Sequence, residues 1–213
     1  MVSTVGDLQQ NCQPLCNEYE YGQIVARAQE QSTLRPNELL AWSATSGLVL
    51  TPMATRRSSS LETVAAPMQV GEWCIRNPGL GGVEGNNRGG FRLPNGDMLI
   101  PDVSYIDEAT WASLSEDQRR MAFVPCVPTV VIELLSDQTD DLEAAIAKMQ
   151  TFASQGCKEC LLVDTRNNLT MLFKPHLTRR PRRQALGTVA FEFWPRFVLD
   201  CQAIRQHREA HGL

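Results

Sequence analysis

The sequence predicts an α/β domain in which a central mixed β-sheet is flanked by helices. Three consecutive segments carry this prediction. Residues 129–135, TVVIELL, are almost all apolar, which is typical of a strand buried on both faces. A helix is expected to start at Thr139, which can serve as its N-cap, and to end at Gly156; residues 160–164, CLLVD, form a second buried strand. A strand, a helix and a strand in this order form a crossover unit, which makes the two strands parallel.

The other strands are expected to pair as hairpins, because residues that reverse a chain tightly separate the apolar runs. The predicted hairpins join residues 38–44 to 48–54, the segment before Asn95-Gly96 to residues 97–106, and residues 160–164 to 169–174. Two more helices are expected between them. The first starts near the serines at 58–60 and is kinked or split by Pro67, and the second covers residues 108–120 on the surface.

We divide the chain into three parts. Residues 1–35 are polar and glutamine-rich and form an N-terminal extension, with a helix expected around residues 21–31. Residues 36–200 form the folded domain. Residues 201–213 form a C-terminal helical tail.

Composition limits the class of protein. At 213 residues and 43% hydrophobic side chains, the chain can bury a sizeable core. The formal charge of -4 argues against a polycation, although a local basic patch can still attract nucleic acid. Seven cysteines, an odd number, fit reduced and mostly buried thiols. The first residues given show no basic stretch followed by an apolar one, and no apolar run reaches about 18 residues, so we expect a cytoplasmic protein without a membrane segment.

Two acidic residues stand where acids are unusual. Glu133 lies inside an apolar strand, and Asp102 follows Pro101, where the run after the Asn95-Gly96 turn is interrupted. Taken singly, Glu133 is explained by a salt bridge or an exposed strand end, and Asp102 by a turn. Together they could converge at a sheet edge or where strands diverge, and two close carboxylates favour a hard divalent cation such as Mg²⁺.

Lys148 is a candidate third member of this site. The apolar stripe of the helix after Thr139 is centred on residues such as Leu142 and Met149, and Lys148 falls on its flank. Its ammonium could reach along the sheet towards the acids. The simpler interpretation is a lysine that extends to water.

Residues 89–175, from GGFRLPNG to LLVDTRNNLTMLFKP, resemble the restriction endonuclease-like proteins, often described only as a domain of unknown function, of the PD-(D/E)XK nuclease superfamily. The order of features matches: a glycine-phenylalanine-leucine-proline hairpin, Pro-Asp, a short helix with tryptophan, a strand ending Glu-x-x-Ser, a helix with Lys-Met, and a strand ending Val-Asp. The resemblance implies a restriction-endonuclease-like core.

The resemblance also implies roles. Asp102 and Glu133 would be metal ligands for Mg²⁺ or Mn²⁺, and Lys148 would position the nucleophilic water. Most of the superfamily has this lysine two residues after the acid, where this chain has Leu135, so the chain looks like a variant with the lysine on the following helix. Glu62 would be a further acid from a helix.

Some positions depart from the family pattern. The chain has Pro128-Thr129 where the family usually has Pro-Asp, and the Ser-Pro-Ser stretch and the glycine-tryptophan before the later strand are also replaced. None of these changes removes an implied ligand.

The implied function is metal-dependent endonucleolytic hydrolysis of DNA phosphodiester bonds, and cutting both strands would favour a homodimer. The first alternative is a catalytically inactive nuclease-like module that binds DNA or a protein. The second is a structural protein stabilised by zinc, for which Cys157-x-x-Cys160 together with Cys12 and Cys16 is a weak match.

A cationic segment near the C-terminus is the candidate DNA contact. It consists of Lys174, Arg179, Arg180, Arg182 and Arg183 in an otherwise acidic protein. Arginine binds phosphate well, and Pro181 would keep the segment extended. A solvated loop explains the same residues equally well. No base-reading helix or zinc-finger spacing is present, so sequence-specific recognition has no support.

Overall fold

The computed structural model describes residues 38–43, 47–52, 57–77, 83–86, 90–135 and 141–209. The N-terminal extension predicted over residues 1–35 lies outside them. The strands are β1 (Glu38–Ser43), β2 (Gly47–Pro52), β3 (Val83–Asn86), β4 (Gly90–Arg92), β5 (Met98–Leu99), β6 (Val103–Ile106), β7 (Phe123–Val124), β8 (Val130–Leu135), β9 (Glu159–Asp164), β10 (Leu169–Phe173), β11 (Arg182–Ala185), β12 (Thr188–Ala190) and β13 (Val198–Asp200). The helices are α3 (Arg57–Arg76), α4 (Glu108–Ser113), α5 (Glu116–Arg119), α6 (Leu142–Ser154) and α7 (Cys201–Glu209).

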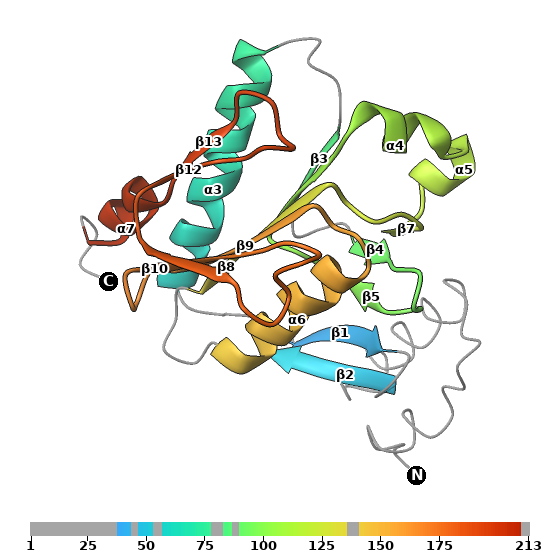
Figure 1. The fold of residues 1–213 in the computed structure, drawn as a ribbon, viewed down its shortest axis with the longest axis horizontal. Coiled ribbons are helices and arrows are strands. Elements are labelled where there is room, and N and C mark those ends of the chain that lie inside the picture. Colours follow the sequence, from blue (N-terminus) through green and yellow to red (C-terminus); the bar gives the residue numbers. More distant parts are fainter. Residues whose placement is uncertain are drawn as a thin grey trace.

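A mixed sheet with the order β11-β10-β9-β8-β6-β3 forms the centre of the described chain (Figure 1). The strands β8 and β9 are parallel and joined through α6, so the predicted crossover unit is confirmed. The predicted hairpins are also found, as the antiparallel pairs β1–β2, β4–β5 and β9–β10. A second sheet with the order β2-β1-β5-β4-β7 adjoins it, and β12 and β13 form a separate pair.

The central sheet has a core on each face, which explains why β8 is apolar throughout. Ile132 belongs to the cluster that includes Trp73 of α3, whereas Val131 belongs to the cluster that includes Phe152 of α6. Alternate residues of a strand point to opposite faces, so a strand covered on both sides must be apolar at nearly every position. The α/β architecture with helices on the sheet is therefore as predicted.

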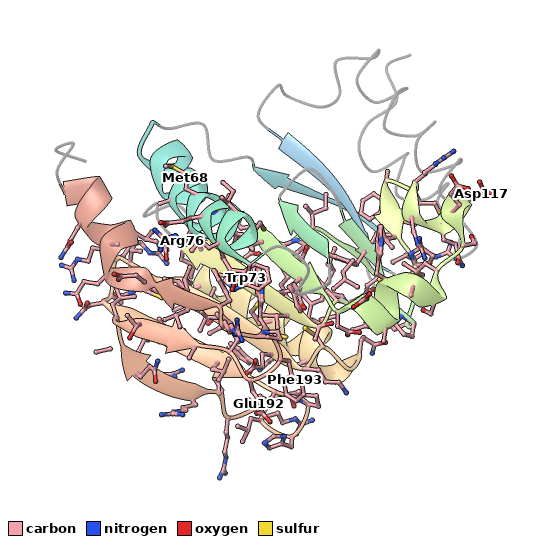
Figure 2. All side chains as sticks on the ribbon, turned by 90° about the horizontal axis from the view of Figure 1, so that it is seen from above. Met68, Trp73, Arg76, Asp117, Glu192 and Phe193 are labelled. Atoms are coloured by element: carbon pink, nitrogen blue, oxygen red, sulfur yellow. The ribbon has the colours of Figure 1, made fainter. Side chains whose placement is uncertain are left out.

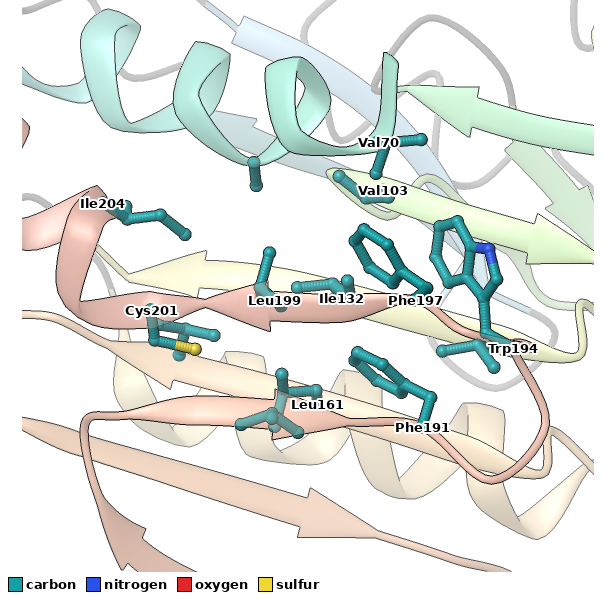
Figure 3. Close-up of a cluster of buried hydrophobic side chains, with 14 of the residues drawn as sticks. Val70, Val103, Ile132, Leu161, Phe191, Trp194, Phe197, Leu199, Cys201 and Ile204 are labelled. Carbon is teal, nitrogen blue, oxygen red and sulfur yellow. The ribbon is translucent and has the colours of Figure 1, made fainter. Parts of the chain in front are cut away.

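The helix α7 packs into the core on the α3 side. Cys201 and Ile204 are fully buried in that cluster, and Figure 3 shows them in line with Leu199 and Phe197 of the preceding segment. Gln69 of α3 binds both the backbone N–H and the carbonyl of Asp200, at 2.8 and 3.0 Å. The segment predicted as a helical tail over residues 201–213 thus begins with α7, and the hydrogen bonds between Gln69 and Asp200 hold the start of this helix next to α3.

Three local predictions were wrong in detail. The helix α6 starts at Leu142 with Asp141 as its N-cap, not at Thr139, because the Asp141 carboxylate accepts the first free N–H groups of the helix. The predicted helix over residues 108–120 is two helices, since Leu114 is buried with an extended backbone and Ser115 begins α5 with a capping box. Of the two effects expected of Pro67, a kink or a split, the split is wrong, because α3 continues through this residue.

No helix in the described ranges has the length and apolar character needed for a membrane span.

Gly90 allows β4 and β7 to lie against each other. A Cβ atom added at this residue would lie 2.5 Å from Cε1 of Phe123, its neighbour in the parallel β4–β7 pair. We therefore expect Gly90→Ala to lower the free energy of unfolding by about 1 to 3 kcal/mol, because the buried Phe123 ring must shift. Urea denaturation measures this change. Gly187→Ala is the control, since nothing lies within 4 Å of its added Cβ, and an equal loss in both variants would contradict the explanation.

Candidate active site

Asp102 lies where the chain passes from one sheet to the other. The strand β5 before it belongs to the sheet with β1 and β4, and β6 after it belongs to the central sheet. The last backbone pair between β6 and β8 is Val103 with Ile132. Beyond that pair, the Asp102 side chain replaces the backbone of β6 as the hydrogen-bond partner of β8, because its Oδ2 accepts the Leu134 N–H at 2.8 Å. This bond orients the carboxylate at the point where the strands diverge.

Glu133 faces the helix α6 and forms an ion pair with it. Its Oε1 accepts a hydrogen bond from Lys148 Nζ at 2.6 Å, and the two side chains are only 15% and 22% exposed. A carboxylate this far out of water is costly unless a positive charge accompanies it. The ammonium of Lys148 provides that charge.

The structure brings Asp102, Glu133 and Lys148 together. Asp102 directly precedes the Val103–Ile132 pair, and its carboxylate binds the N–H of Leu134, the residue after Glu133, so Asp102 and Glu133 lie close together at this end of β6 and β8. Lys148 of α6 completes the group through its hydrogen bond to Glu133. The simpler interpretation of Glu133 holds, because this residue is salt-bridged in the core, whereas that of Lys148 does not, because its ammonium pairs with Glu133 instead of extending to water.

One oxygen of this group has no partner. Oε2 of Glu133 is buried and accepts no hydrogen bond within the described part of the chain. A buried carboxylate oxygen normally accepts at least one bond, so an unsatisfied one in a native fold requires an explanation. It is the atom that an additional cation would satisfy.

The residues present fit a hard divalent cation. Asp102 and Glu133 offer carboxylate oxygens, which Mg²⁺ and Mn²⁺ prefer, and Mg²⁺ commonly retains several waters beside one or two carboxylates. Among the residues that the structure describes, no group of three or more His, Cys, Asp or Glu side chains gathers as a metal site. Glu62 belongs to α3, but its side chain lies outside the described residues.

Lys174 lies in a different network. Its ammonium pairs with Glu159 at 3.2 Å and Glu192 at 2.9 Å, and Glu159 is only 2% exposed and also accepts the Phe193 N–H. Burial lowers the pKa of Lys174, but the hydrogen bonds and charges of Glu192 and Glu159 outweigh it and raise the pKa overall. Figure 2 shows Glu192 and Phe193 side by side, far from Asp117 of α5. This lysine therefore neutralises a buried acid.

The predicted arginines are exposed, and the sheet register separates two of them. Arg179 and Arg180 precede the edge strand β11, which contains Arg182 and Arg183. Glu133 pairs with Leu162, Leu162 with Met171, and Met171 with Arg183, so one row of the sheet joins Glu133 to Arg183. Paired residues share a face, which puts Arg183 on the Glu133 face and Arg182 on the opposite one. Arg183 lies three strands away from Glu133 along this row, which corresponds to about 14 Å.

The two cysteines of the C-x-x-C motif lie in the core. Cys157 and Cys160 are fully buried and free, and Cys157 Sγ lies 3.5 Å from the carbonyl oxygens of Thr129 and Glu159. Burial, together with the neighbouring Cys157 thiol, raises the pKa of Cys160 well above its usual range. They are core thiols in this structure. Cys12 and Cys16 lie outside the described residues.

The sequence analysis missed two features. The bond from the Leu134 N–H to Asp102 leaves no trace in the residue types, because a backbone group makes it. The buried Glu159 could have been found, since it directly precedes the apolar run CLLVD, but the predicted strand began one residue later, at Cys160. Glu159 gives the same kind of signal as Glu133, because each is an acidic residue in or directly beside an apolar run.

The mixed sheet with α3 and α6 on its faces defines a protein of the restriction-endonuclease-like fold class. The crystal structure of a putative nuclease belonging to DUF820 from Anabaena variabilis is similar, with a TM-score of 0.63 and 11% sequence identity, over 79% of this chain and 90% of that chain. The chain belongs to the Uma2 family, described as "Putative restriction endonuclease", whose model matches residues 48–192. No curated protein matches the chain.

Proposed function

We propose that this chain is an endonuclease that hydrolyses DNA phosphodiester bonds with Mg²⁺ or Mn²⁺. Its family and its fold support a nuclease. The observation that carries the finer proposal is the convergence of Asp102, Glu133 and Lys148 at the junction of β6, β8 and α6. Two carboxylates can hold a divalent cation, and an ammonium beside them can stabilise the charge that develops in metal-assisted phosphoryl transfer.

Each residue has a distinct task in this proposal. The bound cation would stabilise charge on the phosphate and lower the pKa of a water. Asp102 and Glu133 would hold it, and both are well positioned because one is fixed by the Leu134 N–H and the other lies on a buried strand. Lys148 has three N–H donors and uses one on Glu133, so others remain for the water or a phosphate oxygen. The positive charge would stabilise the developing oxyanion.

Nicking of supercoiled plasmid tests the proposal. The wild-type chain is expected to convert supercoiled DNA to open circles with Mg²⁺ or Mn²⁺ but not with EDTA. Glu133→Gln keeps the size of the side chain and removes its charge, so it is expected to abolish nicking. Equal nicking by both proteins would contradict the proposal. Tight DNA binding without nicking by the wild type would favour a non-cleaving binding module.

The arginines supply the second test. Because Arg183 shares the sheet face of Glu133 and Arg182 does not, we expect Arg183→Gln to weaken DNA binding more than Arg182→Gln. Losing one phosphate contact should reduce the slope of log K against log salt by about 1. Fluorescence anisotropy with a labelled duplex at several salt concentrations measures both quantities. The two variants lose the same charge from adjacent residues, so equal effects would show that the face is irrelevant.

A further inference from the structure

The Lys148–Glu133 pair has a property that an ordinary core salt bridge lacks. In the described structure the ammonium satisfies Oε1 of Glu133 and leaves the buried Oε2 without a partner. The lysine therefore balances the charge of the carboxylate but only half of its hydrogen-bonding capacity. Such a carboxylate still attracts a second cation.

The lysine is held in place by the packing of its helix. On either side of Lys148 along α6, Ala145, Met149 and Phe152 are buried against the sheet. The Lys148 side chain is 22% exposed, so water screens its charge only partly. It cannot move far from Glu133 without leaving the carboxylate uncompensated. A second cation at Glu133 would therefore have to coexist with this ammonium or displace it.

We propose that the Lys148 ammonium and a divalent cation compete for the Glu133 carboxylate, so that Lys148 lowers the cation affinity of its own site. This inference rests on the proposed function. Like charges at ion-pair distance repel strongly where water is partly excluded, so each cation weakens the hold of the other. The Lys148 ammonium thus balances the charge of the buried Glu133 carboxylate while no divalent cation is bound, and so stabilises the folded chain in that state.

The test measures Mn²⁺ binding directly, without DNA or activity. Isothermal titration calorimetry of the full chain with MnCl₂ is expected to show binding to Lys148→Met at least about tenfold tighter than to the wild type, because one nearby like charge has been removed. Lys158→Met is the control. Lys158 is exposed and lies just before β9, at the end of that strand remote from the Leu135–Asp164 pair, so its loss should leave the affinity unchanged.

Further variants separate the possible failures. Glu133→Gln should lose the binding in both the wild-type and the Lys148→Met background. If the wild type binds Mn²⁺ through Glu133 but Lys148→Met binds equally or more weakly, the competition is refuted and the proposed function stands. If neither protein binds Mn²⁺, both fall. Should Lys148→Met not fold without metal, Lys148→Gln retains a donor for Oε1 and is measured in its place, with the same expected direction.

A thermal measurement supplies an independent readout. Lys148→Met should melt below the wild type without metal, because Glu133 then lies uncompensated, and Mn²⁺ should raise its Tm by more than that of the wild type. Equal shifts on adding Mn²⁺ would oppose the competition.

Discussion

Asp102→Asn is expected to reduce cation-dependent DNA cleavage about a thousandfold, which corresponds to about 4 kcal/mol of lost transition-state stabilisation. The amide is a much weaker ligand for a hard cation than the carboxylate. Its oxygen can still accept the Leu134 N–H that the carboxylate accepts at 2.8 Å, so the junction between β6 and β8 should keep its geometry. Single-turnover cleavage of supercoiled DNA with saturating Mg²⁺ or Mn²⁺ measures the loss.

The comparison with Asp102→Ala separates the two tasks of this side chain. Alanine removes the acceptor, which leaves the Leu134 N–H without it at a cost of about 1 to 3 kcal/mol in stability. Asparagine should therefore be close to wild type in urea denaturation and alanine should not, while both lose cleavage. Asp117→Asn on the exposed surface of α5 is the control for the charge itself. Cleavage by Asp102→Asn at nearly the wild-type rate would remove this residue from the proposed site.

Trp194→Ala is expected to lower the free energy of unfolding by about 3 to 5 kcal/mol, the largest stability change that we predict. Trp194 is fully buried in the core on the α3 side, and Figure 3 shows it beside Phe197. The centroid of its ring lies 4.1 Å from that of Phe197, and its ring stacks on Tyr105 with 4.7 Å between centroids. The aromatic cluster also includes Trp73, at 5.8 Å. Removing the indole would leave a cavity in the core between the central sheet, α3 and the pair β12–β13.

The neighbouring residue provides the control. Phe193 is 38% exposed, and its ring lies 5.9 Å from Lys174 Nζ, a contact worth about 0.5 to 1 kcal/mol at such a site. Phe193→Ala should therefore cost far less than Trp194→Ala in urea denaturation, although both remove an aromatic side chain. Similar losses in the two variants would mean that burial does not determine how much each aromatic side chain contributes to the free energy of unfolding.

Local patterns account for the elements that were predicted correctly. The strands β8 and β9 are apolar because both faces of the sheet are covered, and Gly156, with φ of 109°, ends the turn after α6 as its sequence position indicated. Of the three predictions that failed, the start of α6 was decided locally by the N-cap Asp141, and the other two involve burial in the folded chain. The break between α4 and α5 depends on the burial of Leu114, and the continuity of α3 through Pro67 on its packing, with Ala66 and Val70 in the core.

The candidate site divides in the same way. The sequence by itself determined the α/β class and singled out Asp102, Glu133 and Lys148, because an acid in an apolar strand and a lysine on the flank of a helix are visible in residue order. Only the tertiary structure decided that these groups meet, that Lys174 instead neutralises Glu159, and that Arg182 and Arg183 face opposite sides. The physical reason is that strand register and helix packing join residues far apart in the chain, and no local pattern encodes those distances.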